Sequence, residues 1–142
     1  RDNPEHKKSP FDDLINMQTG LYGYKGAIHF QTAACINDEL EEIRSRNLPK
    51  TEVYTVIAEL IDKYIHQNYR LYPGNYIAHD LLYNKVEFAG NYTTEGKAIF
   101  NQYIDGQLAK ISIPDKDEAF LRECIWAMYA NPVTNHLKAI NG

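Results

Sequence analysis

The sequence is poor in the features that mark several classes of protein. Its two cysteines, Cys35 and Cys124, match no metal-ligand spacing and are too few for a framework of several disulfides. No hydrophobic run approaches the roughly 20 residues that a bilayer-spanning helix needs, and the N-terminal stretch RDNPEHKKSP lacks the apolar segment of a signal peptide. We therefore expect a cytoplasmic chain in a reducing compartment, without a membrane-spanning segment.

An excess of positive charge is missing as well. Lys and Arg number 15 and Asp and Glu number 19, which gives a formal net charge of -4. A nucleic-acid-binding surface needs clustered cations that neutralise phosphates, so we expect no nucleic-acid partner. The length of 142 residues suits one domain or part of one. The first residue is Arg1 rather than Met, and we expect a processed chain or a fragment of a longer one.

What the sequence does contain is helical periodicity. From 49 to 70, apolar residues recur at spacings of three and four behind Pro49, which predicts a long amphipathic helix. Gly20 is expected to end an earlier helix, and Asn131 with Pro132 to begin a separate terminal helix that reaches Ile140. Similar signals predict the remaining helices over 9–18, 37–46, 75–84, 94–110 and from 115 onward.

One segment has the period of a strand instead. Between 27 and 32 the apolar Ile28 and Phe30 alternate with the polar His29 and Gln31, which predicts a strand over 26–32. A lone strand cannot satisfy its backbone hydrogen-bonding groups, and even a two-stranded pair is marginal. Its partner is therefore either a weak strand in LYGY or KISI, or a strand outside this chain.

The five histidines show no catalytic or metal-binding pattern. His79 precedes Asp80, but neighbouring helical positions point about 100° apart, so adjacency alone makes no catalytic dyad. We interpret His79 as a polar position with local hydrogen bonds, and His6 and His136 as solvated. Cys35 and Cys124 are interpreted as small buried hydrophobic residues rather than nucleophiles. We accordingly assign no catalytic, cofactor-binding or metal-binding residue.

Tyrosines cluster between 69 and 84, around Pro73 and Gly74. Tyr combines a large apolar area with a hydroxyl that needs a partner, so this cluster suits either a pocket or partner surface, or a packed corner between two helices. We favour the packed corner. Separately, Lys7, Lys8 and Lys25 give the N-terminal third a modest positive bias that suits an anionic head group, although the acidic run at 38–42 opposes it.

Two stretches carry a resemblance that composition and spacing do not provide. NMQTGLYGYKGAIHFQ, at 16–31, and NYRLYPGNYIA, at 68–78, are the most distinctive, and IPDKDEAFLRECIWAMYANP, at 113–132, supports them. With these stretches, nearly the whole chain resembles the C-terminal part of bacterial phospholipid/glycerol acyltransferases, the 1-acylglycerol-3-phosphate acyltransferase-like family.

The resemblance implies transfer of a fatty acyl group from acyl-CoA or acyl carrier protein to a glycerol phosphate or lysophospholipid hydroxyl, in phospholipid synthesis. That family's general base is a His followed, after four intervening residues, by an Asp. No His here has an Asp at that distance, and Glu95-Gly96 lacks the Pro of the family's Pro-Glu-Gly segment. The resemblance therefore implies that the catalytic residues lie upstream of Arg1. This chain would contact that catalytic region of the same polypeptide, and it would bind no cofactor itself.

The expected fold class is an α/β fragment that is predominantly α. Residues 1–36 would end the acyltransferase α/β core, with one or two strands closing an upstream catalytic sheet, and 37–142 would form an extension of about five helices. Peripheral contact with the inner face of the membrane would come from the upstream part, because the charges of the 49–70 helix are balanced. Two alternatives stay open: a non-catalytic helical protein-interaction module and, more weakly, an independent enzyme that uses His79 or His29.

Overall fold

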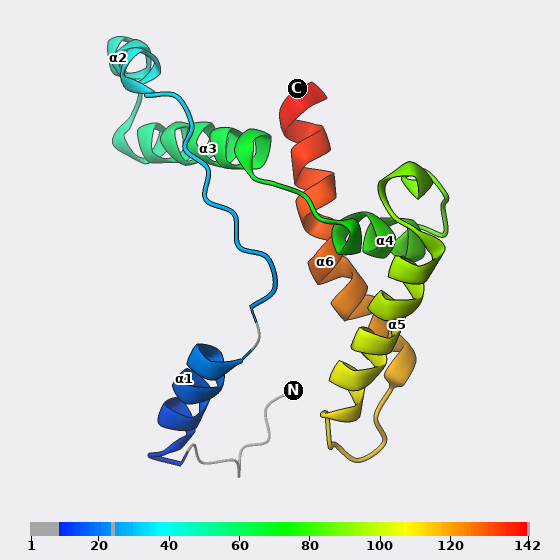
Figure 1. Ribbon diagram of the computed structural model, residues 1–142. Coiled ribbons are helices and arrows are strands. Elements are labelled where there is room, and N and C mark those ends of the chain that lie inside the picture. The colour runs from blue at the N-terminus through cyan, green and yellow to red at the C-terminus, as the bar shows by residue number, and fades with distance from the viewer. Residues whose placement is uncertain (1–8, 24, 142) are drawn as a thin grey trace.

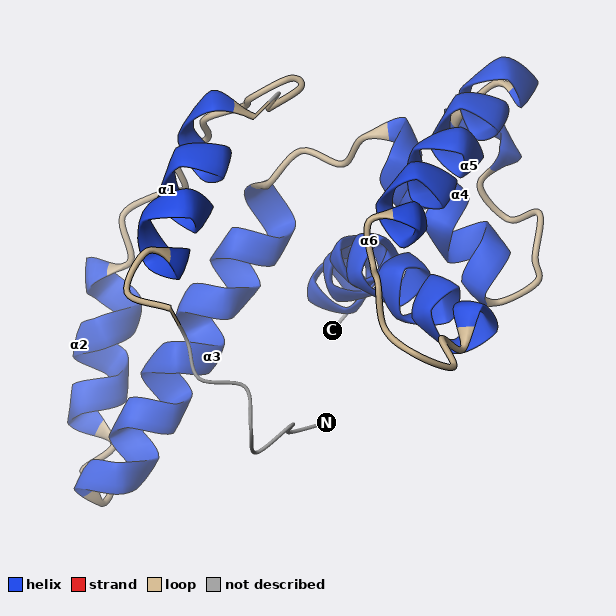
Figure 2. Cartoon of the chain, turned by 90° about the horizontal axis from the view of Figure 1, so that it is seen from below, coloured by secondary structure: helices blue, strands red, loops and turns tan. Residues whose placement is uncertain are grey.

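The computed structural model describes residues 9–23 and 25–141, and every regular element in this part of the chain is a helix (Figures 1 and 2). The long amphipathic helix and the helices expected over 37–46 and 94–110 are confirmed to within two residues at each end. The elements, in chain order, are α1 Asp12–Tyr22, α2 Asn37–Ser45, α3 Lys50–Asn68, α4 Pro73–Leu82, the short 3-10 helix η1 Ala89–Asn91, α5 Thr94–Ala109 and α6 Glu118–Asn141.

The strand expected over 26–32 does not form in the described residues. Residues 25–36 run as an extended segment between α1 and α2, and neither suggested partner pairs with it. Leu21 and Tyr22 belong to α1, which continues past Gly20 because a helical glycine weakens a helix by only about 1 kcal/mol. A strand needs a hydrogen-bonding neighbour, and the described part of the chain supplies none.

The hydrophobic core lies among α4, α5 and α6. Phe100, Ile104 and Leu108 recur every fourth residue, so they share one face of α5 and are all buried. They pack with Ile77 and Ala78 of α4, and α6 closes the cluster with Ala130. Gly74 permits the close approach of α4 to α5, because a Cβ there would lie 3.3 Å from the ring of Phe100.

Two further differences from expectation lie at the start of α4 and in the middle of α6. Asn75 does not begin α4 but lies in its first turn, where its Oδ1 accepts the backbone N–H of Tyr72 at 2.9 Å, and Pro73 takes the first position. The terminal helix predicted to begin at Asn131 and Pro132 is instead the second half of α6. Pro132 has no backbone N–H to donate to the carbonyl of Met128. At the next residue, Asn75 Nδ2 donates to the carbonyl of Tyr129 at 2.9 Å, which joins α4 to this part of α6.

The α2–α3 hairpin joins this core through polar contacts with α6. Gln67 Nε2 donates to the carbonyl of Ala139 at 2.8 Å, and His136 Nδ1 lies 2.8 Å from the carbonyl of His66. The Tyr69 hydroxyl donates to the carbonyl of Pro132. In contrast, α1 contains no buried residue, and Figure 1 shows it at the far end of the extended segment.

Candidate functional site

The buried pair His79 and Asp80 is the first arrangement with chemical potential. Both residues lie in α4 and are buried. His79 Nδ1 is 3.9 Å from Asp80 Oδ1, which is too long for a hydrogen bond. The imidazole packs instead against the rings of Tyr83 and Phe88, at centroid distances of 4.7 and 5.0 Å. The two side chains diverge as the helix geometry predicts, and they do not form a hydrogen-bonded dyad.

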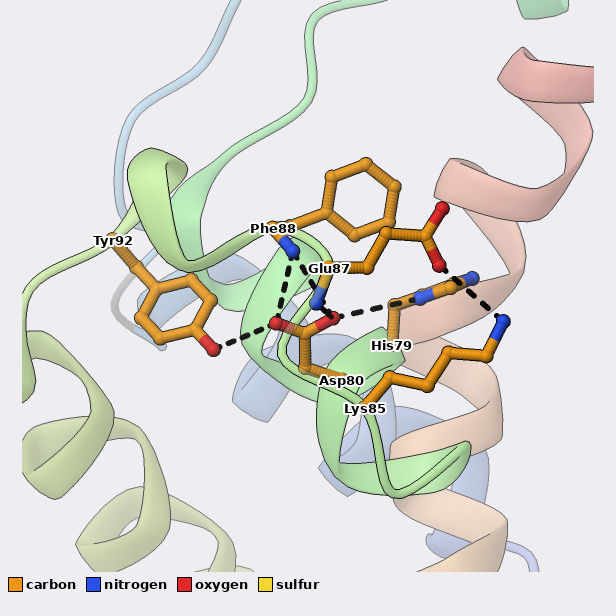
Figure 3. Close-up of polar contacts among 6 residues, drawn as sticks. All are labelled: His79, Asp80, Lys85, Glu87, Phe88 and Tyr92. Atoms are coloured by element: carbon orange, nitrogen blue, oxygen red, sulfur yellow. Dashed lines mark hydrogen bonds and ion pairs between the residues drawn. The ribbon is translucent and has the colours of Figure 1, made fainter.

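Asp80 anchors the loop that follows α4 (Figure 3). Its carboxylate accepts the backbone N–H groups of Glu87 and Phe88 at 3.2 and 3.1 Å, and the Tyr92 hydroxyl at 2.7 Å. The hydrogen bond to this carboxylate raises the pKa of the Tyr92 phenol, because ionisation would bring two negative charges together. These partners occupy the buried carboxylate, so the arrangement suits loop anchoring rather than proton transfer with a substrate.

The structure brings His136 close to His66 and Tyr69, although His136 is far from both in sequence. The Tyr69 ring lies 5.8 Å from the His66 ring and 6.3 Å from the His136 ring, measured between centroids. His136 is half-buried, so the expectation that it is solvated is wrong: α3 covers it. His29 hydrogen-bonds Gln31 at 3.3 Å. His6 lies outside the described residues. Within the described residues, no cluster of three or more metal-ligating side chains occurs.

Neither cysteine behaves as expected. Cys35 and Cys124 are both exposed free thiols, so their assignment as buried residues is wrong. Cys35 lies on the extended segment, where no element covers it, and Cys124 lies on a face of α6 turned away from the core. Cys124 recurs at helical spacing with apolar residues of α6 such as Leu121 and Met128. Spacing alone does not reveal which face of a helix a neighbouring helix covers.

A pocket of about 660 Å³ lies between the extended segment and α3. The C-terminal half of α3 lines it together with the segment that joins α3 to α4. Sequence reasoning placed Tyr69 and Tyr72 in a cluster suited to a pocket or a packed corner, and both alternatives hold in part. Tyr69 and Tyr72 line the pocket, whereas Tyr76 packs against Phe88 at 5.2 Å between ring centroids.

The structure bears on the expectation that the chain has no membrane-spanning helix, and less on the expected positive bias of the N-terminal third. In the described part of the chain, no helix combines the length and apolar character needed to cross a bilayer. Lys7 and Lys8 lie outside the described residues.

Comparison of the chain with protein-family models, with curated proteins and with solved structures gives no match.

Proposed function

We propose that this chain is the C-terminal part of an acyltransferase that moves a fatty acyl group from a thioester carrier to the hydroxyl of a glycerol phosphate or lysophospholipid. The stretches at 16–31 and 68–78, which carry the family resemblance, support the proposal. The chain would contribute structure and not the catalytic base. Acyl-CoA or acyl carrier protein would supply the acyl group.

The uncovered extended segment is the observation on which the proposal depends. Ile28 is 65% exposed and Phe30 is 92% exposed, and α1 before them buries no residue. Contiguous exposed apolar side chains mark surfaces that associate with a partner. An extended segment with alternating apolar residues is suited to adding a strand to an open sheet edge. In our proposal, residues 26–32 form that strand on an upstream α/β core, and α1 packs on the same core.

In our proposal, the residues that catalyse acyl transfer lie in the upstream region. The acceptor hydroxyl oxygen attacks the thioester carbonyl and forms a C–O bond while a general base takes the hydroxyl proton. The C–S bond then breaks, and the carrier leaves as a thiol after its thiolate takes up that proton. His79 is buried, and the neighbouring Asp80 carboxylate is occupied by the loop after α4. The proposal therefore assigns no catalytic residue to residues 9–23 and 25–141.

An acyl-transfer assay on two forms of the protein tests this function. The natural gene product that contains this chain should acylate glycerol 3-phosphate or a lysophospholipid from acyl-CoA or acyl carrier protein, and the 142 residues alone should not. Phe30→Asp in the natural product should lower transfer, whereas Ile99→Asp, on an exposed face of α5, should not. Transfer by the isolated chain, or its absence from the natural product with every donor and acceptor, would contradict the proposal.

A second candidate is a non-catalytic helical interaction module. The self-contained core of α4, α5 and α6 favours it, because that core needs no upstream sheet. It predicts cooperative unfolding of the isolated chain and no acyl transfer by any natural protein that contains it. Acyl transfer that is lost on Phe30→Asp would exclude it.

A further inference from the structure

The 660 Å³ pocket has the size and composition of a ligand site. Its volume falls within the range of about 300 to 1,000 Å³ that small-molecule sites occupy. The lining side chains of α3 include Ile61 and Ile65, and the extended segment contributes Phe30 and Ala33. Figure 1 shows this segment running past α3 on its way from α1 to α2.

Most polar side chains that line the pocket are already hydrogen-bonded within the protein. The Tyr64 hydroxyl donates to the carboxylate of Glu39, and the Tyr69 hydroxyl to the carbonyl of Pro132. Asn68 Nδ2 donates to the carbonyl of Tyr64 at 2.8 Å. With their hydroxyls engaged, Tyr64 and Tyr69 present their rings to the pocket, which favours an apolar ligand.

Arg70 adds a positive charge to the lining of the pocket. Its guanidinium carbon lies 5.5 Å from the centroid of the Tyr72 ring, and it forms no ion pair with any residue in the described part of the chain. A guanidinium over an aromatic ring keeps its N–H donors available for a carboxylate or a phosphate. The pocket therefore combines a large apolar surface with one uncompensated cation.

We propose that this pocket binds a single-chain amphiphile with an anionic head group. The hydrocarbon chain lies along Ile61 and Ile65 of α3, and the head group meets Arg70. Binding removes from water side chains that are otherwise exposed, among them Ile61 at 43% and Ile65 at 52%. The inference rests on the proposed function for its biological role, because fatty acids and lysophospholipids belong to this class of molecule. The binding itself is a property of the 142 residues.

Calorimetric titration of the intact chain with octanoate, decanoate and dodecanoate, each kept below its micellar concentration, tests the apolar half of the site. Affinity should rise by up to about fourfold for each added methylene, which corresponds to about 0.8 kcal/mol per buried methylene. Ile65→Glu should abolish binding. Ile99→Glu changes an equally exposed isoleucine outside the pocket and should leave it unchanged. Circular dichroism confirms that both variants fold.

The charged half of the site is tested with Arg70→Gln. This variant should lower dodecanoate affinity about tenfold, the effect of losing a charge-assisted hydrogen bond, and should leave the affinity for neutral dodecanol unchanged. Comparison of dodecanoate with lauroyl glycerol phosphate tells a carboxylate ligand from a phosphate ligand. Equal losses for dodecanoate and dodecanol would overturn the assignment of the head group to Arg70.

Failure of this inference can be told apart from failure of the proposed function. Absence of binding, or binding that ignores chain length and Ile65→Glu, would overturn the pocket assignment even if the natural gene product transfers acyl groups. Chain-length-dependent binding that requires Ile65, without acyl transfer by the natural product, would keep the pocket and remove the acyltransferase.

Discussion

The two ends of this chain differ in what their apolar residues achieve. In α4, α5 and α6 the apolar side chains face one another, and Ile77, Ile104 and Ala130 are completely or almost completely removed from water. In α1 and the extended segment, Leu14, Ile15 and Phe30 are equally apolar but remain mostly exposed. Hydrophobic free energy comes from area removed from water and not from composition. The C-terminal block thus has a core of its own, whereas the N-terminal arm, residues 9–23 and 25–36, leaves its large apolar side chains mostly in water.

A core truncation should give the largest contrast between these regions. Ile104→Ala removes a fully buried side chain from α5 and should lower the free energy of unfolding by about 2 to 5 kcal/mol. Ile28→Ala, the matched change on the arm, should alter it by less than about 0.5 kcal/mol. Urea unfolding followed by circular dichroism measures both. Equal losses would mean that the arm is packed in solution.

Removal of the loop anchor should have the next largest effect. Asp80→Ala leaves the backbone N–H groups of Glu87 and Phe88 without their acceptor, which should cost about 2 to 3 kcal/mol. Glu87→Gln, which removes only an exposed ion pair with Lys85, should cost less than about 1 kcal/mol. Hydrogen exchange at residues 87 and 88 should accelerate in the first variant alone. Unchanged exchange there would show that Asp80 does not hold this loop.

Part of this organisation follows from the sequence, and particular residues show where the rest comes from. The long helix after Pro49 and the helix over Phe100, Ile104 and Leu108 were predicted because periodicity is local. The continuity of α6 through Pro132 was not, because a proline is locally typical of a helix start, and contacts such as the hydrogen bond from Asn75 to the Tyr129 carbonyl join residues far apart in sequence. The role of Asp80 was missed for a related reason: its partners lie in a loop without a distinctive pattern.

A smaller loss should follow from Asn75→Ala, which removes that hydrogen bond from α4 to α6 and also the acceptor of the Tyr72 backbone N–H. The free energy of unfolding should fall by about 1 to 1.5 kcal/mol. Asn131→Ala changes an exposed residue of α6 and should be within about 0.5 kcal/mol of the unaltered chain. Chemical denaturation measures both variants. An equal effect of the two would show that the hydrogen bonds of Asn75 do not stabilise α4 and its contact with α6.

Alkaline titration should destabilise the C-terminal block before it changes the arm. Burial, together with the hydrogen bond to Tyr103, raises the pKa of Tyr129 to about 12, whereas an unfolded phenol titrates near about 10. The folded state therefore holds this proton more tightly, and stability falls as pH rises from about 10 toward 12. Tyr129→Phe should make that fall shallower, as measured by thermal unfolding across the range. A slope that Tyr129→Phe leaves unchanged would contradict this.

The smallest effect on stability should come from the arm itself. Phe30→Asp should change the free energy of unfolding of the isolated chain by less than about 0.5 kcal/mol, because Phe30 is already exposed. The same substitution in the natural gene product should lower stability clearly, since it would place a charge against the upstream core. Unfolding measurements on both forms compare the two costs, and equal costs would mean that the arm has no partner there.

Hydrogen exchange of residues 26–32 in the two forms of the protein tests the partner-dependence of the arm most directly. In the isolated chain these amides should exchange rapidly while those of α4 and α5 are protected, because within residues 9–23 and 25–141 no strand pairs with the arm. In the natural gene product the same amides should become protected, in the alternating manner of an edge strand. Rapid exchange of residues 26–32 in both forms would contradict the proposal that this segment completes a sheet.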